Sequence, residues 1–358
     1  MLSYGLGDAG TGLAATQLGF YLFPFFIGYA GLPALIAGSI LMLIKIWDAI
    51  NDPFIGWLSD KTKTRWGPRI PWMLSAAIPL GFSLAAIWWV PSGNIREKTT
   101  YYVIISIILM TAYTSVNLPF AALSTELSKD ISVRTRLNAA RFTGSILAGL
   151  SGLIIAANIL SKNSFGYFSM GKLSGLIAAL ATLISCWGLA PYAKRARRPS
   201  KKNISLKLQL KRIFNNRKFI KVITLYLLLW CALQLMQTVS LIYVEQVLQI
   251  PSQYAKWIPI PFQLSALAGL QIWSLFSNKF GRIKALYSGS IIWILSCLLT
   301  LVIPVFSVSE NIDTLFFSQG NNLYLFIFLV LVICLIGIGA STAYLIPWSL
   351  LPDAIDED

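Results

Sequence analysis

Residues Lys45–Gly67 read KIWDAINDPFIGWLSDKTKTRWG. The stretch begins inside a long apolar segment, which holds the ionisable residues Lys45, Asp48 and Asp52, and it ends in a loop rich in positive charge. A charged side chain at the centre of a membrane-spanning helix costs about 2.5–3.5 kcal/mol, and such residues are usually functional. The stretch therefore predicts a membrane-spanning helix that carries a functional site and ends at the membrane surface.

The whole chain has the composition of a polytopic membrane protein. Of its 358 residues, 56% are hydrophobic and 12% are charged, whereas soluble domains have roughly 45–50% apolar and about 25% charged residues. The net charge of +15 lies in short loops between apolar runs, which is not the basic stripe of a nucleic-acid binder, so we expect no nucleic-acid partner. The chain has no His, which leaves carboxylates as the groups that can hold a proton or a cation.

Apolar runs bounded by charges or by Gly and Pro predict an all-α protein with ten membrane-spanning helices. The helices are expected at residues 5–29, 32–58, 71–92, 99–126, 136–161, 170–193, 219–248, 253–277, 284–305 and 322–351. The small-residue run GSILAGLSGL, residues 144–153, predicts close packing of the fifth helix against a neighbour.

Lys and Arg are concentrated in the even-numbered loops between these helices. The second, fourth and eighth loops carry ten of these residues, and the sixth loop carries more. The ten are Lys61, Lys63, Arg65, Arg69, Lys129, Arg134, Arg136, Lys279, Arg282 and Lys284. The positive-inside rule then places the even loops and the N-terminus in the cytoplasm. We expect an integral, multi-pass protein of a bacterial-type inner membrane.

The sixth loop is long, polar and basic, and it divides the chain into two parts. We expect a six-helix bundle at residues 1–193, a basic cytoplasmic linker at 194–218 and a four-helix bundle at 219–358. The segment LSDKTKTRWGPR after the second helix is echoed by FSNKFGRIKAL after the eighth. Parallel repeats joined by a basic loop are typical of major facilitator transporters.

Two of the predicted helices carry polar oxygens at one depth in the membrane. Asp48 and Asp52 share a helix face, with Asn51 beside them. At 1.5 Å per residue, Asp48 lies about 24 Å and Thr114 about 22 Å from the outer ends of their helices, and Asn117 lies one turn beyond Thr114. Hard cations bind such oxygen ligands, and two close carboxylates need a shared cation or proton. The pattern predicts a cation-coupling site.

A structural alternative is that the two acids only hold helices together. In that case Asp48 and Asp52 would pair with Lys45, one turn earlier, and with Arg141, which is expected level with Asp52 near the start of the fifth helix. Asp8 on the first helix is open to two interpretations, because it can line a cavity or lie at the cytoplasmic interface.

The segment IWDAINDPFIGWLSDKTKTRWGPRIPW, residues 46–72, resembles the glycoside-pentoside-hexuronide cation symporters of the major facilitator superfamily, the family of the melibiose permease. The likeness continues in LSYGLGDAG at the start, in YTSVNLPFAAL of the fourth helix, in AARF of the fifth and in WSLLPDAIDED at the end. It implies a major facilitator fold of two helical bundles and cation-coupled transport.

The resemblance also implies which residues form the sites. The cation-binding set is expected to be Asp48, Asn51, Asp52 and Thr114. The solute-binding set is expected to be Asn117, Arg141, Tyr344 and Lys45. No resident metal or cofactor is expected, and the coupling ion would be Na⁺ or H⁺, with Li⁺ as a further candidate.

The chain departs from the family pattern at the solute site. Tyr344 stands where the melibiose permease has Trp, Gly12 and Asn117 stand where it has acids, and Ala121 stands where it has a second Trp. These differences argue against melibiose itself, although Asn117 can still donate and accept hydrogen bonds to sugar hydroxyls. In the family two more helices follow the segment like LLPDAIDED, so we expect a fragment or a truncation to ten helices, with the last two absent.

The expected function is symport of a cation with a sugar or glycoside by alternating access, carried out by a monomer. Two alternatives stay open: a carrier of lysolipids or other amphiphiles from the same superfamily, and an inactive truncated paralogue. An enzyme is not expected, because the sequence shows no constellation of nucleophile and base and no metal-ligand spacing.

Overall fold

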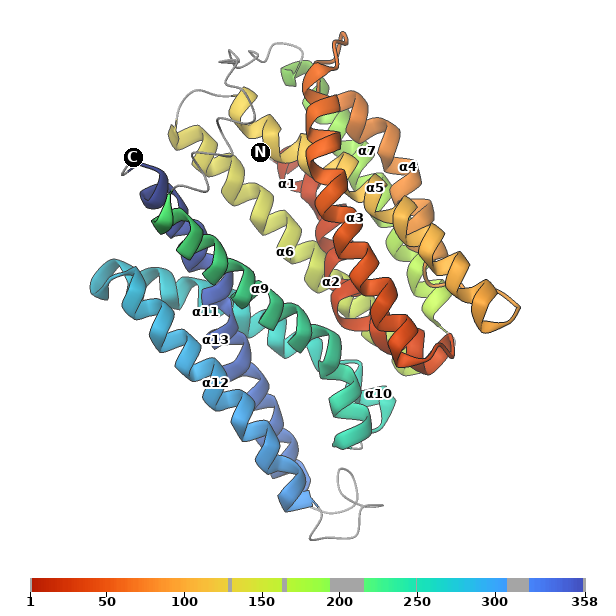
Figure 1. Ribbon diagram of the computed structural model, residues 1–358, viewed down its shortest axis with the longest axis vertical. Coiled ribbons are helices and arrows are strands. Elements are labelled where there is room, and N and C mark those ends of the chain that lie inside the picture. Colours follow the sequence, from red (N-terminus) through yellow and green to blue (C-terminus); the bar gives the residue numbers. More distant parts are fainter. Residues whose placement is uncertain are drawn as a thin grey trace. The chain divides into compact units, whose positions relative to one another are not determined.

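The computed structural model describes residues 2–127, 131–162, 166–193, 216–248, 250–307 and 322–356 (Figure 1). Within these ranges the regular secondary structure is helical throughout. Nine of the described helical stretches are long and apolar enough to cross a membrane, and Ile70–Ala86 is a shorter apolar helix. The expected all-α, polytopic architecture is confirmed.

The chain forms two compact units, Met1–Ser200 and Lys201–Asp358. The first unit contains α1 (Leu2–Gly5), η1 (Leu6–Asp8), α2 (Ala9–Pro24), η2 (Phe25–Tyr29), α3 (Ala34–Lys61), α4 (Ile70–Ala86), α5 (Ile95–Leu127), α6 (Ile131–Lys162) and α7 (Tyr167–Ala193). The second contains α9 (Arg217–Ile242), η3 (Tyr243–Val247), α10 (Ser252–Ala255), α11 (Pro259–Phe280), α12 (Arg282–Ser307) and α13 (Asn322–Asp356). Most of the linker expected at 194–218 lies outside the described residues.

Each unit is organised around a few close helix contacts. In the first unit α5 packs against both α3 and α4, α4 packs against α7, and α2 packs against α6 (Figure 1). In the second unit α13 packs against α9, α11 and α12. The helix that carries the two membrane aspartates, α3, is therefore a direct neighbour of the helix that carries Thr114.

The helix expected at 71–92 is shorter than predicted, because α4 ends at Ala86 although the apolar run continues. The last carbonyl of α4 and one just beyond the helix accept bonds from side chains of α5: the Tyr101 hydroxyl donates to Ala86 O at 2.7 Å and the Tyr102 hydroxyl donates to Trp89 O at 3.1 Å. Hydropathy alone does not distinguish a helical turn from an irregular apolar segment whose carbonyls have such donors.

The first helix of each unit ends in the same unusual turn. In the π-helices η2 and η3, the first two carbonyls accept bonds from backbone amides five and six residues further along, at 2.9 Å in η2 and 3.1 Å in η3. Pro33 follows the first turn and Pro251 the second, each with the extended backbone that starts the next helix. The two units thus share a detailed backbone pattern at corresponding positions.

The two echoed basic segments also share a backbone feature. Gly67 and Gly281 both have positive φ, 83° and 93°, a conformation that L side chains rarely adopt. Gly281 ends α11 and Gly67 lies in the loop before α4. The similarity between the segments, which is weak in sequence, is supported by the backbone.

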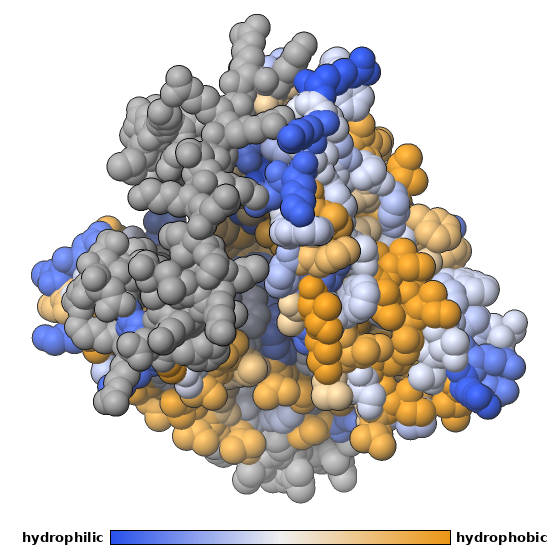
Figure 2. All heavy atoms as spheres, turned by 45° about the horizontal axis from the view of Figure 1, so that its top comes forward, coloured by the Kyte–Doolittle hydropathy of each residue, from blue (hydrophilic) through white to orange (hydrophobic). Residues whose placement is uncertain are grey.

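Exposed apolar side chains lie on many of the long helices. On α3 the exposed residues Met42, Ile46, Ile50 and Phe54 recur every fourth position and form a stripe along the helix. Figure 2 shows wide hydrophobic areas on one face of the molecule. A stripe of this kind suits contact with lipid tails, and it leaves the other side of α3 for polar contacts with α5.

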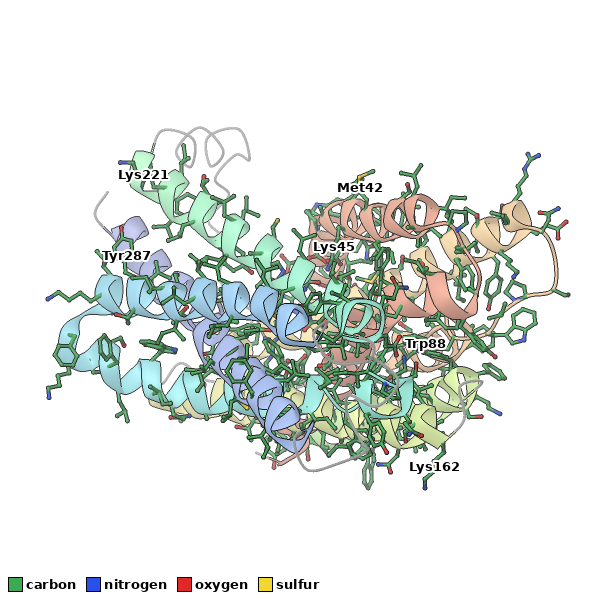
Figure 3. All side chains as sticks on the ribbon, turned by 90° about the horizontal axis from the view of Figure 1, so that it is seen from below. Met42, Lys45, Trp88, Lys162, Lys221 and Tyr287 are labelled. Atoms are coloured by element: carbon green, nitrogen blue, oxygen red, sulfur yellow. The ribbon has the colours of Figure 1, made fainter. Side chains whose placement is uncertain are left out.

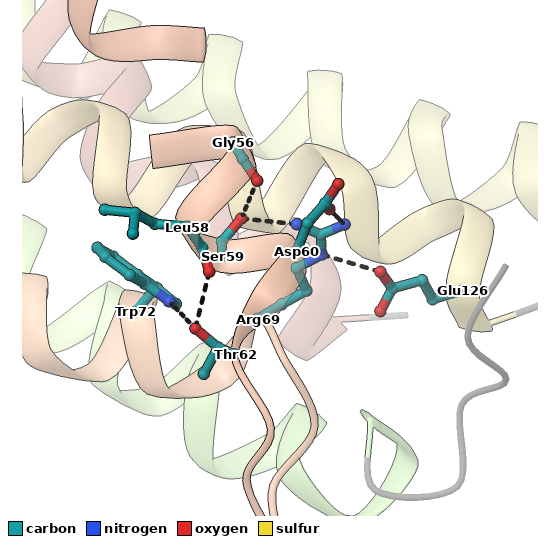
Figure 4. A network of polar contacts seen from close by, with 8 residues as sticks. All are labelled: Gly56, Leu58, Ser59, Asp60, Thr62, Arg69, Trp72 and Glu126. Atoms are coloured by element: carbon teal, nitrogen blue, oxygen red, sulfur yellow. Dashed lines mark hydrogen bonds and ion pairs between the residues drawn. The ribbon is translucent and has the colours of Figure 1, made fainter. Parts of the chain in front are cut away.

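Arg69, immediately before α4, joins the ends of three helices (Figure 4). Its Nε donates to Glu126 Oε1 at 2.8 Å, one Nη donates to Ser59 Oγ at 2.7 Å, and the other donates to Asp60 Oδ1 at 2.6 Å. The side chains of Arg69 and Glu126 are 9% and 4% exposed. Ser59 and Asp60 lie on α3 and Glu126 on α5, so one buried guanidinium fixes the ends of α3 and α5 to the start of α4.

Glycines allow the helix backbones to approach closely. An added Cβ at Gly144 on α6 would meet the carbonyl oxygen of Gly5, and one at Gly175 on α7 would meet that of Gly81 on α4. The close packing predicted from residues 144–153 is confirmed.

We expect Gly175→Ala to lower the free energy of unfolding by about 1–3 kcal/mol, because the added methyl group meets backbone that cannot rotate away. Gly38→Ala on α3 is the matched control: nothing lies within 4 Å of the added atom, and a helical Gly→Ala change in open space stabilises by roughly 0.5–1 kcal/mol. Thermal unfolding of the purified variants would test this, and equal midpoints for the two variants would contradict it.

Candidate functional site

Thr114 on α5 joins the two aspartates of α3. Its hydroxyl oxygen lies 3.0 Å from Asp52 Oδ1 and 3.4 Å from Asp48 Oδ1, within hydrogen-bond distance of both. Thr114 is almost completely buried, and both aspartates are partly buried. The structure therefore brings together the three residues that the depth argument placed at one level.

Two further contacts set the register of α3 against α5. The Trp47 indole nitrogen donates to Thr111 Oγ1 at 3.0 Å, and the Asn51 amide nitrogen approaches Met110 O at 3.5 Å. Asn51 is buried beside the aspartates. With its nitrogen turned toward the α5 backbone, its side-chain oxygen is the atom available as a fourth ligand.

The chemistry of this group suits a monovalent cation. Two carboxylates, a hydroxyl and an amide provide hard oxygen ligands, the kind preferred by alkali and alkaline-earth ions. Two carboxylates that share one hydroxyl also repel each other in a low dielectric, and a cation or a proton removes that repulsion. Binding of a cation by Asp48, Asn51, Asp52 and Thr114 stays a prediction that these distances allow.

A second polar cluster lies on the neighbouring turn of α5. Arg141 on α6 donates from Nε to Asp8 Oδ2 at 2.9 Å and from one Nη to Asn117 Oδ1 at 3.1 Å. Thr11 donates to the other oxygen of Asp8 at 2.7 Å. Asp8 is buried inside the first unit, and its two interpretations, lining a cavity or lying at the cytoplasmic interface, stay predictions.

The ion pair of Arg141 corrects one structural alternative. Arg141 was considered as a partner of Asp48 or Asp52, but the structure pairs it with Asp8. The physical reason is proximity, because η1, which carries Asp8, packs against α6, which carries Arg141. A continuous helix over residues 5–29 was expected, but the structure interrupts it at Asp8, where φ is −102° and ψ is 0°.

Tyr113 was not singled out from the sequence. It lies on α5 directly before Thr114 and one turn before Asn117, and it interacts electrostatically with Asp8, Asp52 and their neighbours Asp48 and Arg141. Tyr113 therefore interacts with charged members of both clusters. Its position in the sequence could have indicated this. Tyr113 precedes Thr114 directly and lies one helical turn before Asn117, so its side chain is close to both residues.

Lys45 and Tyr344 complete the expected solute-binding set. Lys45 lies on α3 one turn before Asp48, is exposed (Figure 3), and interacts electrostatically with Asp48, as the structural alternative expected. Tyr344 belongs to the second unit, where its hydroxyl lies 3.4 Å from the Gln237 amide nitrogen and its ring meets Trp230 edge-on at 5.7 Å. Gln237 and Trp230 were not predicted, and they make Tyr344 part of a polar and aromatic group on α9 and α13.

A sequence profile of a family described as MFS/sugar transport protein matches residues 3–358. Among individual proteins, an uncharacterised symporter of Synechocystis is 30% identical over 442 aligned positions, which cover 100% of this chain and 78% of that protein. The YagG protein of Escherichia coli carries the name of a glycoside/cation symporter. It is 26% identical in an alignment that covers 99% of this chain and 74% of YagG.

A relative with a different named solute is similar over the same length. The sodium-dependent lysophosphatidylcholine symporter 1 of Gallus gallus is 25% identical over 99% of this chain and 70% of its own. Solved structures share the fold: the nucleoside transporter NupG gives a TM-score of 0.67 at 15% identity, covering 95% of this chain and 79% of its own. The structure of a D-xylose–proton symporter gives a TM-score of 0.62 at 16% identity. The alignment covers 98% of this chain and 82% of that one.

Proposed function

Because the chain belongs to the MFS/sugar transport protein family, we propose that it is a secondary transporter that couples the movement of a cation to that of a solute by alternating access. The observation that carries this proposal is the contact of Thr114 with both Asp48 and Asp52. A cation there removes the repulsion between the acids, so its binding favours one conformation of the first unit. The same conformation must then bind the solute more tightly, by the same factor.

The solute we propose is a sugar or glycoside. Arg141, Asn117 and Asp8 place nitrogen donors and oxygen acceptors within one small polar cluster, and sugar hydroxyls need both. The name of the Escherichia coli relative points the same way. A lysophospholipid is the second candidate, and it rests on the name of the Gallus gallus relative.

For the cellular setting, we propose a bacterial-type inner membrane with the N-terminus in the cytoplasm. The basic residues of the loops support this orientation, because positive charges accumulate on the cytoplasmic side. Na⁺ or H⁺ is proposed as the coupling ion, since carboxylates bind both. Li⁺ is a further candidate because its chemistry resembles that of Na⁺. We propose that the transporter works as a monomer.

The test is uptake into proteoliposomes that contain the purified protein. From a labelled panel of glycosides, pentoses and hexuronides, we expect at least one solute to accumulate when a sodium or proton gradient is imposed, and to stop accumulating when an ionophore collapses that gradient. Lysophosphatidylcholine is measured in the same vesicles as the competing solute. Gradient-driven uptake of the lysolipid alone would replace the sugar proposal, and folded protein that moves none of these solutes would contradict the transporter proposal.

A further inference from the structure

Asp8 is a buried carboxylate that the cation site does not use. It is 6% exposed and lies at the junction of η1 and α2. One carboxylate oxygen accepts from Arg141 Nε at 2.9 Å and the other accepts from Thr11 Oγ1 at 2.7 Å. Both oxygens are therefore engaged, and the carboxylate has a defined position and a defined charge partner.

Arg141 is held on several sides. Besides Asp8, it donates to Asn117 Oδ1 at 3.1 Å, and its guanidinium carbon lies 5.7 Å and 5.6 Å from the ring centres of Phe120 and Phe142. A guanidinium has five N–H donors in one plane, and these contacts account for one on Nε and one on an Nη atom. The other nitrogen carries two more N–H groups in a fixed direction, which suits a solute hydroxyl.

The ion pair is not needed to bring its two helices together. The backbones of α1 and α6 already meet at Gly5 and Gly144, and an added Cβ at Gly12 on α2 would meet Ser145 of α6. A buried ion pair is in general a weak source of stability, because desolvation offsets its attraction. The presence of Asp8 and Arg141 in this tightly packed contact therefore calls for another role.

That role follows from charge. The positive charge of Arg141 and the negative charge of Asp8 cancel within one contact. A carboxylate or phosphate on a solute that approached Arg141 would meet Asp8 a few ångström away, and like charges in a low dielectric repel strongly. A hydroxyl group meets no such repulsion and can both donate and accept.

We propose that Asp8 is a positioning residue that fixes Arg141 and cancels its charge, so that the solute site selects uncharged polyhydroxylated solutes over anionic ones. The inference rests on the proposed function and names the solute class of the same site. It separates neutral glycosides and pentosides from hexuronides, which differ by one carboxylate.

The test compares solutes matched in all but charge. Methyl β-D-glucoside and methyl β-D-galactoside compete for uptake into proteoliposomes against the corresponding methyl uronides, in which a carboxylate replaces the C6 hydroxymethyl group. For the wild type we expect a neutral glycoside to bind at least about tenfold more tightly than its uronide. For Asp8→Asn we expect this ratio to shift toward the uronide by about tenfold or more, because the solute carboxylate now compensates Arg141.

Three controls separate charge selection from a structural role. Asp8→Glu keeps the charge and should keep the preference for the neutral solute. The double variant Asp8→Asn/Arg141→Gln restores a neutral site and should lose the gain for the uronide. Cation-dependent thermal stabilisation of Asp8→Asn should match the wild type, since the aspartates of α3 are intact.

An Asp8→Asn protein that keeps the wild-type ratio of neutral to anionic solute would overturn this inference and leave the proposed function standing. A wild type that takes the uronide as well as the glycoside would overturn it too, even if Asp8→Asn cannot be obtained folded. A wild type that shows no gradient-driven uptake of any solute would overturn the proposed function, and the inference with it.

Discussion

Asp52→Asn is expected to reduce cation-driven uptake to the level of protein-free vesicles. The substitution keeps the shape of the side chain but removes one of the two negative charges that face Thr114. An amide does not compensate a bound cation, and loss of one partner of a buried charge interaction costs about 2–5 kcal/mol. At 1.4 kcal/mol per tenfold change, the affinity for the cation falls about 30-fold or more.

The measurement has two parts. Initial uptake rates are recorded against the cation concentration, and cation-dependent thermal stabilisation is recorded on the same purified protein. Thr114→Ser is the conservative control, because it keeps the hydroxyl that contacts both acids, and it should retain cation dependence. Thr114→Val, which removes the hydroxyl at similar volume, should weaken it. Uptake by Asp52→Asn with an unchanged cation dependence would place the coupling site elsewhere.

Arg69→Ala is expected to destabilise the protein by about 3–5 kcal/mol, the range seen when one partner of a buried ion pair is removed. Three acceptors lose the guanidinium of Arg69 at once, and two of them are carboxylates. Glu126 is the costly one, because its side chain is 4% exposed and water cannot replace the guanidinium there.

Lys63→Ala is the matched control, since it removes one positive charge from the same loop at an exposed position. Its effect should stay within about 0.5 kcal/mol, as for ordinary surface substitutions. Thermal unfolding in detergent would compare the two variants with the wild type. If both variants melted at the same temperature, the network around Arg69 would not be a stabilising element.

The arrangement of the α3 acids and Thr114 could be predicted from the sequence because helix geometry is regular. The rise per residue fixes the depth of Asp48, Asp52 and Thr114 along their helices, and the apolar stripe on α3 leaves only one side for polar contacts. The contact distances observed between these residues need only that α3 and α5 are neighbours. The helix rise and the apolar stripe are both properties of a single helix, so the local sequence is enough to predict them.

The cluster around Asp8 could not be predicted in the same way. Its geometry depends on the packing of η1 against α6 and on the face of α6 that carries Arg141 toward Asp8. Neither follows from hydrophobic periodicity. The early end of α4 has a similar cause, because the hydroxyls of Tyr101 and Tyr102 belong to a different helix. Contacts between distant segments decide such details.

The paired turns at η2 and η3 have an evolutionary consequence. A π turn arises when one residue is inserted into an α-helix, and it is rare. Here one occurs at the end of the first helix of each unit, with the same two backbone bonds and the same following proline. A single insertion in an ancestral half-length chain, copied when that chain was duplicated, accounts for both turns with one event instead of two.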